Sequence, residues 1–242
     1  MNRLEFFKWL DTHYTDAEHI RMVKEKFDNN SERFLDIEQS TAMDTELVNS
    51  IKESLVDGKR LIETGTEFGS FILNFINDID DIETCEVDEE YYTIAKYRLK
   101  DTHINYHLKQ SEELLRGLKL KDTDVFFLDA HGGGYDEFND NPLTNELKEI
   151  KNQNIKPVIY IHDFGIEMET INNNDWYFEH ESLDKKYRYR FDFSVHSGWK
   201  LDWDFIKDNI ESIYGKDGYL ITYPTFNEPT IHPVGWIKIT KK

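Results

Sequence analysis

LIETGTEFGSF, Leu61 to Phe71, runs from an apolar segment into a turn with two glycines. Glycine lets the main chain approach a ligand closely, and a helix that begins after such a turn presents free backbone N–H groups. The spacing acid-x-Gly-x-x-x-Gly differs from the Gly-x-Gly-x-x-Gly of dinucleotide sites, because Glu67 stands where the second glycine would be. The stretch predicts either a ligand-binding turn after a strand or a tight turn without a ligand.

Apolar runs and helical patterns alternate on both sides of this turn. Strand-like runs occupy residues 59–64, 82–87, 104–109, 124–130 and 156–164, and helical patterns lie between them at residues 71–78, 89–100, 111–118 and 142–153. This order is typical of an open, doubly wound parallel sheet with helices on both faces. Two more strand-like runs, residues 218–226 and 232–240, predict an antiparallel C-terminal hairpin. We expect an α/β, Rossmann-like fold with a mostly parallel seven-stranded sheet.

Two segments differ from this pattern. Residues 1–41 place apolar side chains three and four apart, and we expect an N-terminal helical extension packed over the main domain, residues 42–242. Residues 165–200 are polar and aromatic without a strict period, which indicates an irregular insert in that domain. The aromatic rings of the insert could contact a glycan, bury a lid or form a contact between subunits, as in a homo-oligomer.

Composition excludes several classes of function. The formal net charge of -19 and the absence of a basic run argue against nucleic acid as a partner. The sequence has no apolar stretch that approaches the roughly 18 residues of a membrane span. Its first residues lack a signal-peptide pattern, and its single cysteine, Cys85, cannot form an internal disulfide. We expect a cytoplasmic protein.

The second and third strand-like runs end in polar residues suited to a nucleoside. Glu86 follows Gly69 by 17 residues and can accept hydrogen bonds from both hydroxyls of a ribose. Gln110 and Ser111 offer donors and acceptors to an adenine edge. Ser111 could equally be the N-cap of the helix that begins there. A cofactor that carries a nucleoside is the leading interpretation.

The ordered motifs IETGTEFGSF, CEVDEEYYTIAKYRL, LKQSEELL, FFLDAH and VIYIHDF resemble those of class I S-adenosylmethionine-dependent methyltransferases over residues 42–164. The strand end Leu-Asp-Ala-His and the helix PLTNELKEI are similar to a subgroup related to metal-dependent sugar O-methyltransferases and cephalosporin hydroxylase-like proteins. Glu146 in that helix matches the subgroup, although a glutamate in a helix is usually at the surface. Gln110 departs from the acid that the family usually has at its position.

The resemblance implies that the first turn lines the methionine moiety of S-adenosylmethionine and that Glu86 holds its ribose. The residues predicted to bind the cofactor are Glu63, Gly65, Thr66, Glu67, Phe68, Gly69, Glu86, Val87, Gln110, Ser111 and Asp129.

The fourth and fifth strand-like runs end in LDAH and IHDF, which place Asp129, His131, His162 and Asp163 at neighbouring points of the sheet edge. Carboxylates with one imidazole suit a divalent cation such as Mg²⁺ or Mn²⁺ better than Zn²⁺. The resemblance implies Asp129, His162 and Asp163 as metal ligands. His131 or His162 could instead be a general base, and all four could be structural. Gly132 to Gly134 are expected to bend the chain away from this edge.

Together with the resemblance, these residues predict an enzyme, a methyltransferase that transfers a methyl group to a small-molecule or glycan acceptor, at a sugar or polyol hydroxyl, with the help of a divalent metal. Asp129, His131 and His162 are its predicted catalytic residues. Two alternatives remain: a metal-dependent hydrolase or hydroxylase-like enzyme on the same fold, and a non-catalytic protein that binds S-adenosylmethionine.

Overall fold

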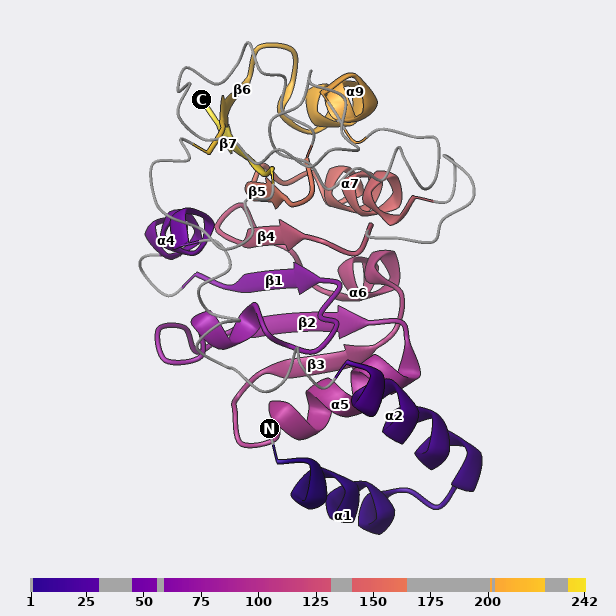
Figure 1. The fold of residues 1–242 in the computed structure, drawn as a ribbon. Helices are drawn as coiled ribbons and strands as arrows, with labels where there is room; N and C mark the ends of the chain where they lie inside the picture. The colour runs from indigo at the N-terminus through magenta and orange to yellow at the C-terminus, as the bar shows by residue number, and fades with distance from the viewer. Residues whose placement is uncertain are drawn as a thin grey trace, which may run out of the picture.

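A seven-stranded sheet forms the centre of the protein. The structure, a computed structural model, describes residues 2–30, 45–55, 59–131, 141–164, 201, 203–224 and 235–242. The strands are β1 (Leu61–Thr64), β2 (Ile82–Glu86), β3 (Asn105–Leu108), β4 (Val125–Leu128), β5 (Val158–Ile161), β6 (Tyr219–Thr222) and β7 (Ile237–Lys241). They lie in the order β3-β2-β1-β4-β5-β7-β6 (Figure 1).

The first five strands pair in parallel, while β7 is antiparallel to both β5 and β6. The chain leaves β1 for β2 and β3 on one side and returns to β4 on the other, so the strand order reverses beside β1. Ligands of open α/β sheets bind at such a switch point, beyond the carboxyl ends of the strands. The predicted mostly parallel sheet with an antiparallel C-terminal hairpin is confirmed.

Helices cover both faces of the sheet, because successive strand residues point to opposite sides. Ile62, Phe126 and Leu128 face α6 (Ser111–Gly117), α7 (Pro142–Asn152) and α9 (Trp203–Tyr214). Leu61, Val125 and Phe127 face α4 (Thr45–Ser54) and α5 (Glu89–Arg98). The central strands β1 and β4 are buried on both sides, whereas the edge strands β3 and β6 are partly exposed.

Two helices precede the sheet: α1 (Arg3–His13) and α2 (Ala17–Asn29). Asn2 and Asp16 cap them, each side chain accepting hydrogen bonds from two backbone N–H groups of the first turn. Both helices lie beyond α5 at the β3 end of the sheet (Figure 1). They pack there through an aromatic cluster that also contains Phe68 of the first turn.

One predicted helix is wrong. Residues 71–78 form only a 3-10 turn, η2 (Ile72–Asn74), followed by further turns. The Asn74 side chain donates to the Phe71 carbonyl oxygen at 2.8 Å. Asparagine competes in this way with the helical backbone pattern, so the apolar spacing alone was misleading.

Three predictions fall on segments outside the described residues: the insert at residues 165–200, the bend at Gly132 to Gly134, and the boundary between residues 41 and 42. Among the helices that the structure describes, none has the length and apolarity needed to cross a membrane.

Candidate active site at the carboxyl edge of the sheet

The turn after β1 depends on Gly65. Its φ of +80° is unfavourable for other residues, and a Cβ there would lie 2.6 Å from the Asp129 carbonyl oxygen. The backbone N–H groups of Gly65 and Thr66 both donate to the Cys85 carbonyl oxygen, at 3.1 and 3.0 Å. The turn is therefore fixed between the ends of β2 and β4, where the sequence places its predicted ligand-binding residues.

Glu86 links this turn to the end of β2. Its carboxylate accepts hydrogen bonds from the backbone N–H groups of Glu67 (2.8 Å), Val87 (2.8 Å) and Asp88 (2.9 Å). Burial raises the pKa of Glu86, and these three N–H groups oppose the rise. A carboxylate offers about four acceptor positions, so one remains for a ligand hydroxyl. Glu67 has φ +47°, a conformation that the bond to Glu86 helps to hold.

Glu63 is buried at the end of β1, with 1% of its surface exposed. The Thr84 hydroxyl donates to it at 2.5 Å, and Thr84 in turn contacts the hydroxyl of Thr66. Burial raises the pKa of Glu63 to about 8, Thr84 opposes this, and the charges of Asp129 and Glu86 add to it. The Glu63 carboxyl is a buried acid that a cationic group would stabilise as a carboxylate.

The remaining residues of the predicted cofactor site differ in exposure. Val87 is 58% exposed beside Glu86 and presents an apolar surface, whereas Phe68 is buried in the aromatic cluster with α1 and α2. Gln110 is exposed, and it, rather than Ser111, occupies the N-cap position of α6. Ser111 is buried, and its hydroxyl has no hydrogen-bond partner among the described residues. The suggested N-cap role of Ser111 is therefore wrong.

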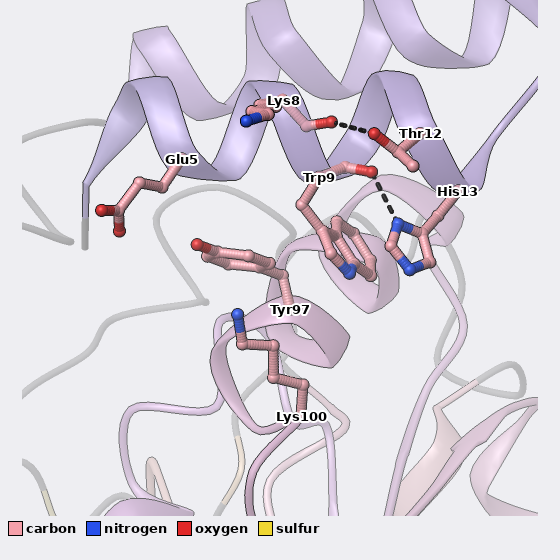
Figure 2. A pocket seen from close by; sticks show the side chains of 7 residues that line it. All are labelled: Glu5, Lys8, Trp9, Thr12, His13, Tyr97 and Lys100. Atoms are coloured by element: carbon pink, nitrogen blue, oxygen red, sulfur yellow. Dashed lines mark hydrogen bonds between the residues drawn. The ribbon is translucent and has the colours of Figure 1, made fainter.

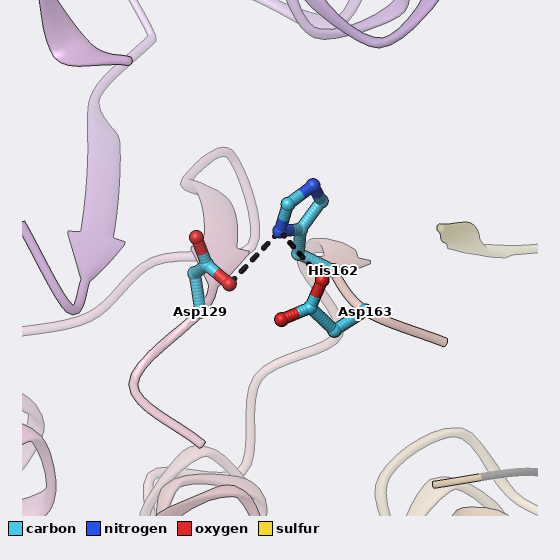
Figure 3. Close-up of side chains that lie close together, drawn as sticks. All are labelled: Asp129, His162 and Asp163. Atoms are coloured by element: carbon cyan, nitrogen blue, oxygen red, sulfur yellow. Dashed lines mark hydrogen bonds and ion pairs between the residues drawn. The ribbon is translucent and has the colours of Figure 1, made fainter. Parts of the chain in front are cut away.

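Asp129, His162 and Asp163 converge where β4 and β5 end (Figure 3). His162 Nδ1 donates to Asp129 Oδ1 at 2.9 Å and lies 3.6 Å from Asp163 Oδ1. One ligand atom from each residue lies within 4.8 Å of the other two, a cluster that is unique within the part of the chain that the structure describes. The three side chains are only 12 to 25% exposed.

The pKa of Asp163 responds to its burial and to its two charged neighbours. Burial raises the pKa of Asp163 to about 6, His162 opposes the rise, and the charge of Asp129 adds to it. Its φ of +53° is uncommon for an aspartate and turns its carboxyl toward Asp129 and His162 (Figure 3). Strained backbone of this kind clusters at functional sites.

The donor set fits a divalent cation. Two carboxylates and one imidazole nitrogen are the ligands that Mn²⁺ and Mg²⁺ accept, and a cation between Asp129 and Asp163 would relieve their repulsion. Asp129, His162 and Asp163 would hold the ion. His131 is placed differently: it is fully buried, and its Nε2 donates to the His162 carbonyl oxygen at 2.8 Å. Burial lowers the pKa of His131, so it supports the position of His162 as a neutral ring.

Comparison with known proteins supports the fold. No family model and no curated protein matches the sequence. Solved structures do match. A candidate caffeoyl-CoA O-methyltransferase from Staphylococcus aureus has a TM-score of 0.51 and 14% identity, over 100% of this chain and 99% of that one. The chain has the class I methyltransferase fold.

Two more structures with this methyltransferase fold are similar. An O-methyltransferase from Bacillus cereus, in complex with SAH, has a TM-score of 0.50 and 16% identity, over 96% of this chain and 94% of that one. DesVI from Streptomyces venezuelae has a TM-score of 0.51 and 13% identity, over 89% of this chain and 98% of that one. Identities this low establish the fold and leave the reaction open.

Sequence reasoning missed two residues of this methyltransferase fold. Glu146, expected at the surface, is completely buried on α7. Its signal was its spacing, because Leu143, Glu146, Leu147 and Ile150 follow the helical period of one buried face. Arg98, in the last turn of α5, donates to the Phe68 carbonyl oxygen (3.2 Å) and to Ser70 Oγ (2.6 Å). These hydrogen bonds attach the turn after β1 to α5.

A separate groove of about 340 Å³ lies between α1 and the end of α5 (Figure 2). Trp9, Tyr97 and Lys100 line it, with Glu5, Lys8, Thr12 and His13. The polar contacts drawn there are local ones within α1, from Thr12 Oγ1 to the Lys8 carbonyl oxygen and from His13 Nδ1 to that of Trp9. The groove shares no residue with the predicted site at the sheet edge.

Proposed function

We propose that the protein is an S-adenosylmethionine-dependent O-methyltransferase, assisted by a divalent cation, that acts on a hydroxyl group of a sugar or other polyol. One observation carries the proposal: the convergence of Asp129, His162 and Asp163 at the edge that also carries Glu63 and Glu86. That edge unites a set of cofactor contacts with a set of metal ligands. Cys85, the single cysteine, is consistent with a cytoplasmic enzyme.

Four of the predicted cofactor residues have a definite task in this proposal. The turn at Gly65 lets the main chain approach the methionine part, and the buried Glu63 carboxyl faces its cationic groups. Glu86 accepts a ribose hydroxyl with its remaining acceptor position. Val87 packs its exposed side chain on the adenine.

A bound S-adenosylmethionine, held by Glu63 and Glu86, would supply an electrophilic methyl group for transfer to the acceptor oxygen, whose proton would pass to a base of this chain. A divalent cation held by Asp129, His162 and Asp163 would lower the pKa of the acceptor hydroxyl. Asp129 and Asp163 line the part of the site where the acceptor hydroxyl would bind. His162 is the base where no cation engages its Nδ1, and Asp129 orients its ring.

Binding and turnover test the proposal. We expect calorimetry to show binding of S-adenosylmethionine and of S-adenosylhomocysteine, the homocysteine product of the transfer. Glu86→Ala should weaken the binding of both compounds by about 1 to 3 kcal/mol, because a charge-assisted hydrogen bond is lost. Asp163→Ala should abolish cation-dependent transfer and leave cofactor affinity nearly unchanged. Absence of binding at millimolar cofactor would refute the proposal. Turnover that requires a cation but no methyl donor would instead favour a hydrolase or hydroxylase-like enzyme.

The acceptor is a separate part of the proposal. The acidic net charge of -19 argues against nucleic acid as the acceptor. A screen of sugars and polyols with radiolabelled methyl donor would identify the acceptor class. Retention of label by nucleic acid alone would refute this part.

A further inference from the structure

Glu146 is a buried acid with an unusual environment. It lies in the first half of α7, and none of its surface is exposed. Within the described part of the chain, neither carboxyl oxygen has a hydrogen-bond partner. Buried polar groups are nearly always paired, because an unpaired one costs roughly 1 to 3 kcal/mol. A glutamate kept at this position despite such a cost calls for a functional reason.

Glu146 lies on α7 and Ser111 on α6, and these two helices pack against each other in one apolar cluster. Burial raises the pKa of Glu146 to about 7, and the hydroxyls of Ser111 and Thr64, near the carboxyl but outside full hydrogen-bond geometry, oppose the rise. Ser111 begins α6, and its hydroxyl also has no partner among the described residues. Thr64 ends β1, directly before Gly65, and is completely buried.

Thr64 connects Glu146 to Asp129. The backbone N–H of Asp129 donates to Thr64 Oγ1 at 3.2 Å and to the Thr64 carbonyl oxygen at 3.1 Å. A threonine hydroxyl that accepts from Asp129 has its own proton left to donate, and Glu146 is the acceptor beside it. Small adjustments of Ser111 and Thr64 would therefore join the end of β1, the main chain of Asp129 and the first turn of α6 through one carboxyl.

We propose that Glu146 is a positioning residue, which acts through Thr64 and Ser111 to hold the end of β1 and the start of α6 in the arrangement that binds the cofactor. This inference rests on the proposed function of the site. Glu146 does not reach the ligand, since it is completely buried. Leucine has a similar volume and would fill the space without an unpaired acid. Glutamate at this position therefore lowers the free energy of unfolding, and in return it fixes the end of β1 relative to the start of α6.

The test compares Glu146→Leu and Glu146→Gln with wild type, and with Leu147→Ile as a control for the packing of α7. We expect Glu146→Leu to raise the midpoint of thermal unfolding and to weaken binding of the homocysteine product about tenfold, because the two hydroxyls lose their common partner. Without ligand, hydrogen exchange in peptides that cover residues 61–66 and 110–114 should become faster. Glu146→Gln keeps a donor and an acceptor and should bind within about threefold of wild type.

Several outcomes would overturn the inference. If Glu146→Leu bound the product as wild type does, or if exchange in both peptides were unchanged, Glu146 would be a buried acid without a positioning role. If Glu146→Leu failed to fold, Glu146→Ala and Ser111→Ala, made singly and together, would decide: two independent losses would add, whereas a shared network would not. If wild type itself bound no product, the proposed function would fail, and the exchange comparison would still test Glu146.

Discussion

Glu63 should give the protein a measurable pH dependence. The pKa of Glu63 is raised from 4.5 to about 8, so the folded protein keeps a proton that the unfolded chain loses. Its contribution to stability is therefore full below about pH 4.5 and declines as the pH rises toward 8. Glu63→Gln removes this decline while its amide oxygen still accepts from Thr84. We expect the unfolding free energy of Glu63→Gln, relative to that of wild type, to increase by about 2 kcal/mol between about pH 6 and pH 8.

Denaturant unfolding at the two pH values provides the measurement. Glu53→Gln, on the exposed face of α4, is the matched control and should show no such growth. Asp163 and Glu146 also have raised pKa values, but both variants retain them, so their contribution cancels in the comparison. An equal response of the two variants would contradict a buried, protonated Glu63.

Gly65 offers a second test at the residue scale. Gly65→Ala forces an L side chain to φ +80° and brings its Cβ within 2.8 Å of Ala130 Cα. We expect a loss of about 2 kcal/mol or more in unfolding free energy, measured by denaturant titration, together with loss of cofactor binding. Gly117→Ala is the control, because a Cβ there meets no atom within 4 Å. A Gly65→Ala variant as stable as the control would show that the turn can relax.

At the scale of elements, α2 and α5 contact both halves of the predicted cofactor site. Lys26 of α2 donates to Asp88 at 2.5 Å, and Asp88 caps α5 two residues after Glu86. Phe68 of the first turn packs against Tyr91 of α5, with ring centroids 4.8 Å apart. The helices that the sequence predicts as an extension thus share one apolar cluster with Phe68 of the turn that the sequence predicts as the binding site.

Arg98 tests this arrangement. Its two donor contacts, to the Phe68 carbonyl oxygen and to Ser70 Oγ, come from one terminal nitrogen of a rigid, planar guanidinium, which the shorter and more flexible side chain of lysine does not reproduce. We expect Arg98→Lys to weaken binding of the homocysteine product by about three- to tenfold in calorimetry, roughly 1 kcal/mol. Arg116→Lys is the matched control, since Arg116 pairs with Glu149 at the surface. Identical affinities of the two variants would remove Arg98 from the support of the turn.

The elements show where sequence reasoning succeeds and fails. Continuous apolar runs such as Val125 to Leu128 predicted buried parallel strands, because burial on both faces leaves a strong pattern. The predicted helix at residues 71–78 failed, because side-chain hydrogen bonds such as that of Asn74 leave no periodic signal. At the site, the strand ends located Asp129 and Asp163, since parallel strands end at one edge. The burial of Glu146 was missed because a glutamate in a helix is usually exposed, although its spacing from Leu143 and Leu147 places it on the buried face of α7.

At the scale of the whole molecule, the net charge of -19 opposes folding through self-repulsion. Salt shortens the Debye length from about 30 Å at 0.01 M to about 8 Å at 0.15 M, so potassium chloride should raise the unfolding midpoint in denaturant. The dependence of unfolding free energy on denaturant should keep its slope, because the exposed surface does not change. A midpoint independent of salt would mean that acidic side chains repel one another equally in the unfolded chain.

Divalent cations would act on this acidic protein in two ways, by screening its surface charge and by binding at one cluster, and the two effects can be separated. Any cation screens the acidic surface, but only binding at Asp129, His162 and Asp163 requires that cluster. At matched ionic strength, manganese chloride should stabilise wild type beyond potassium chloride, by about 2.7 kcal/mol when free Mn²⁺ is a hundredfold above its dissociation constant. Asp163→Asn should keep the response to potassium and lose the excess, and a chelator should remove the excess from wild type. An equal response of wild type and Asp163→Asn to manganese would show that the cation acts on the acidic surface alone, and transfer would then depend on His162 as base.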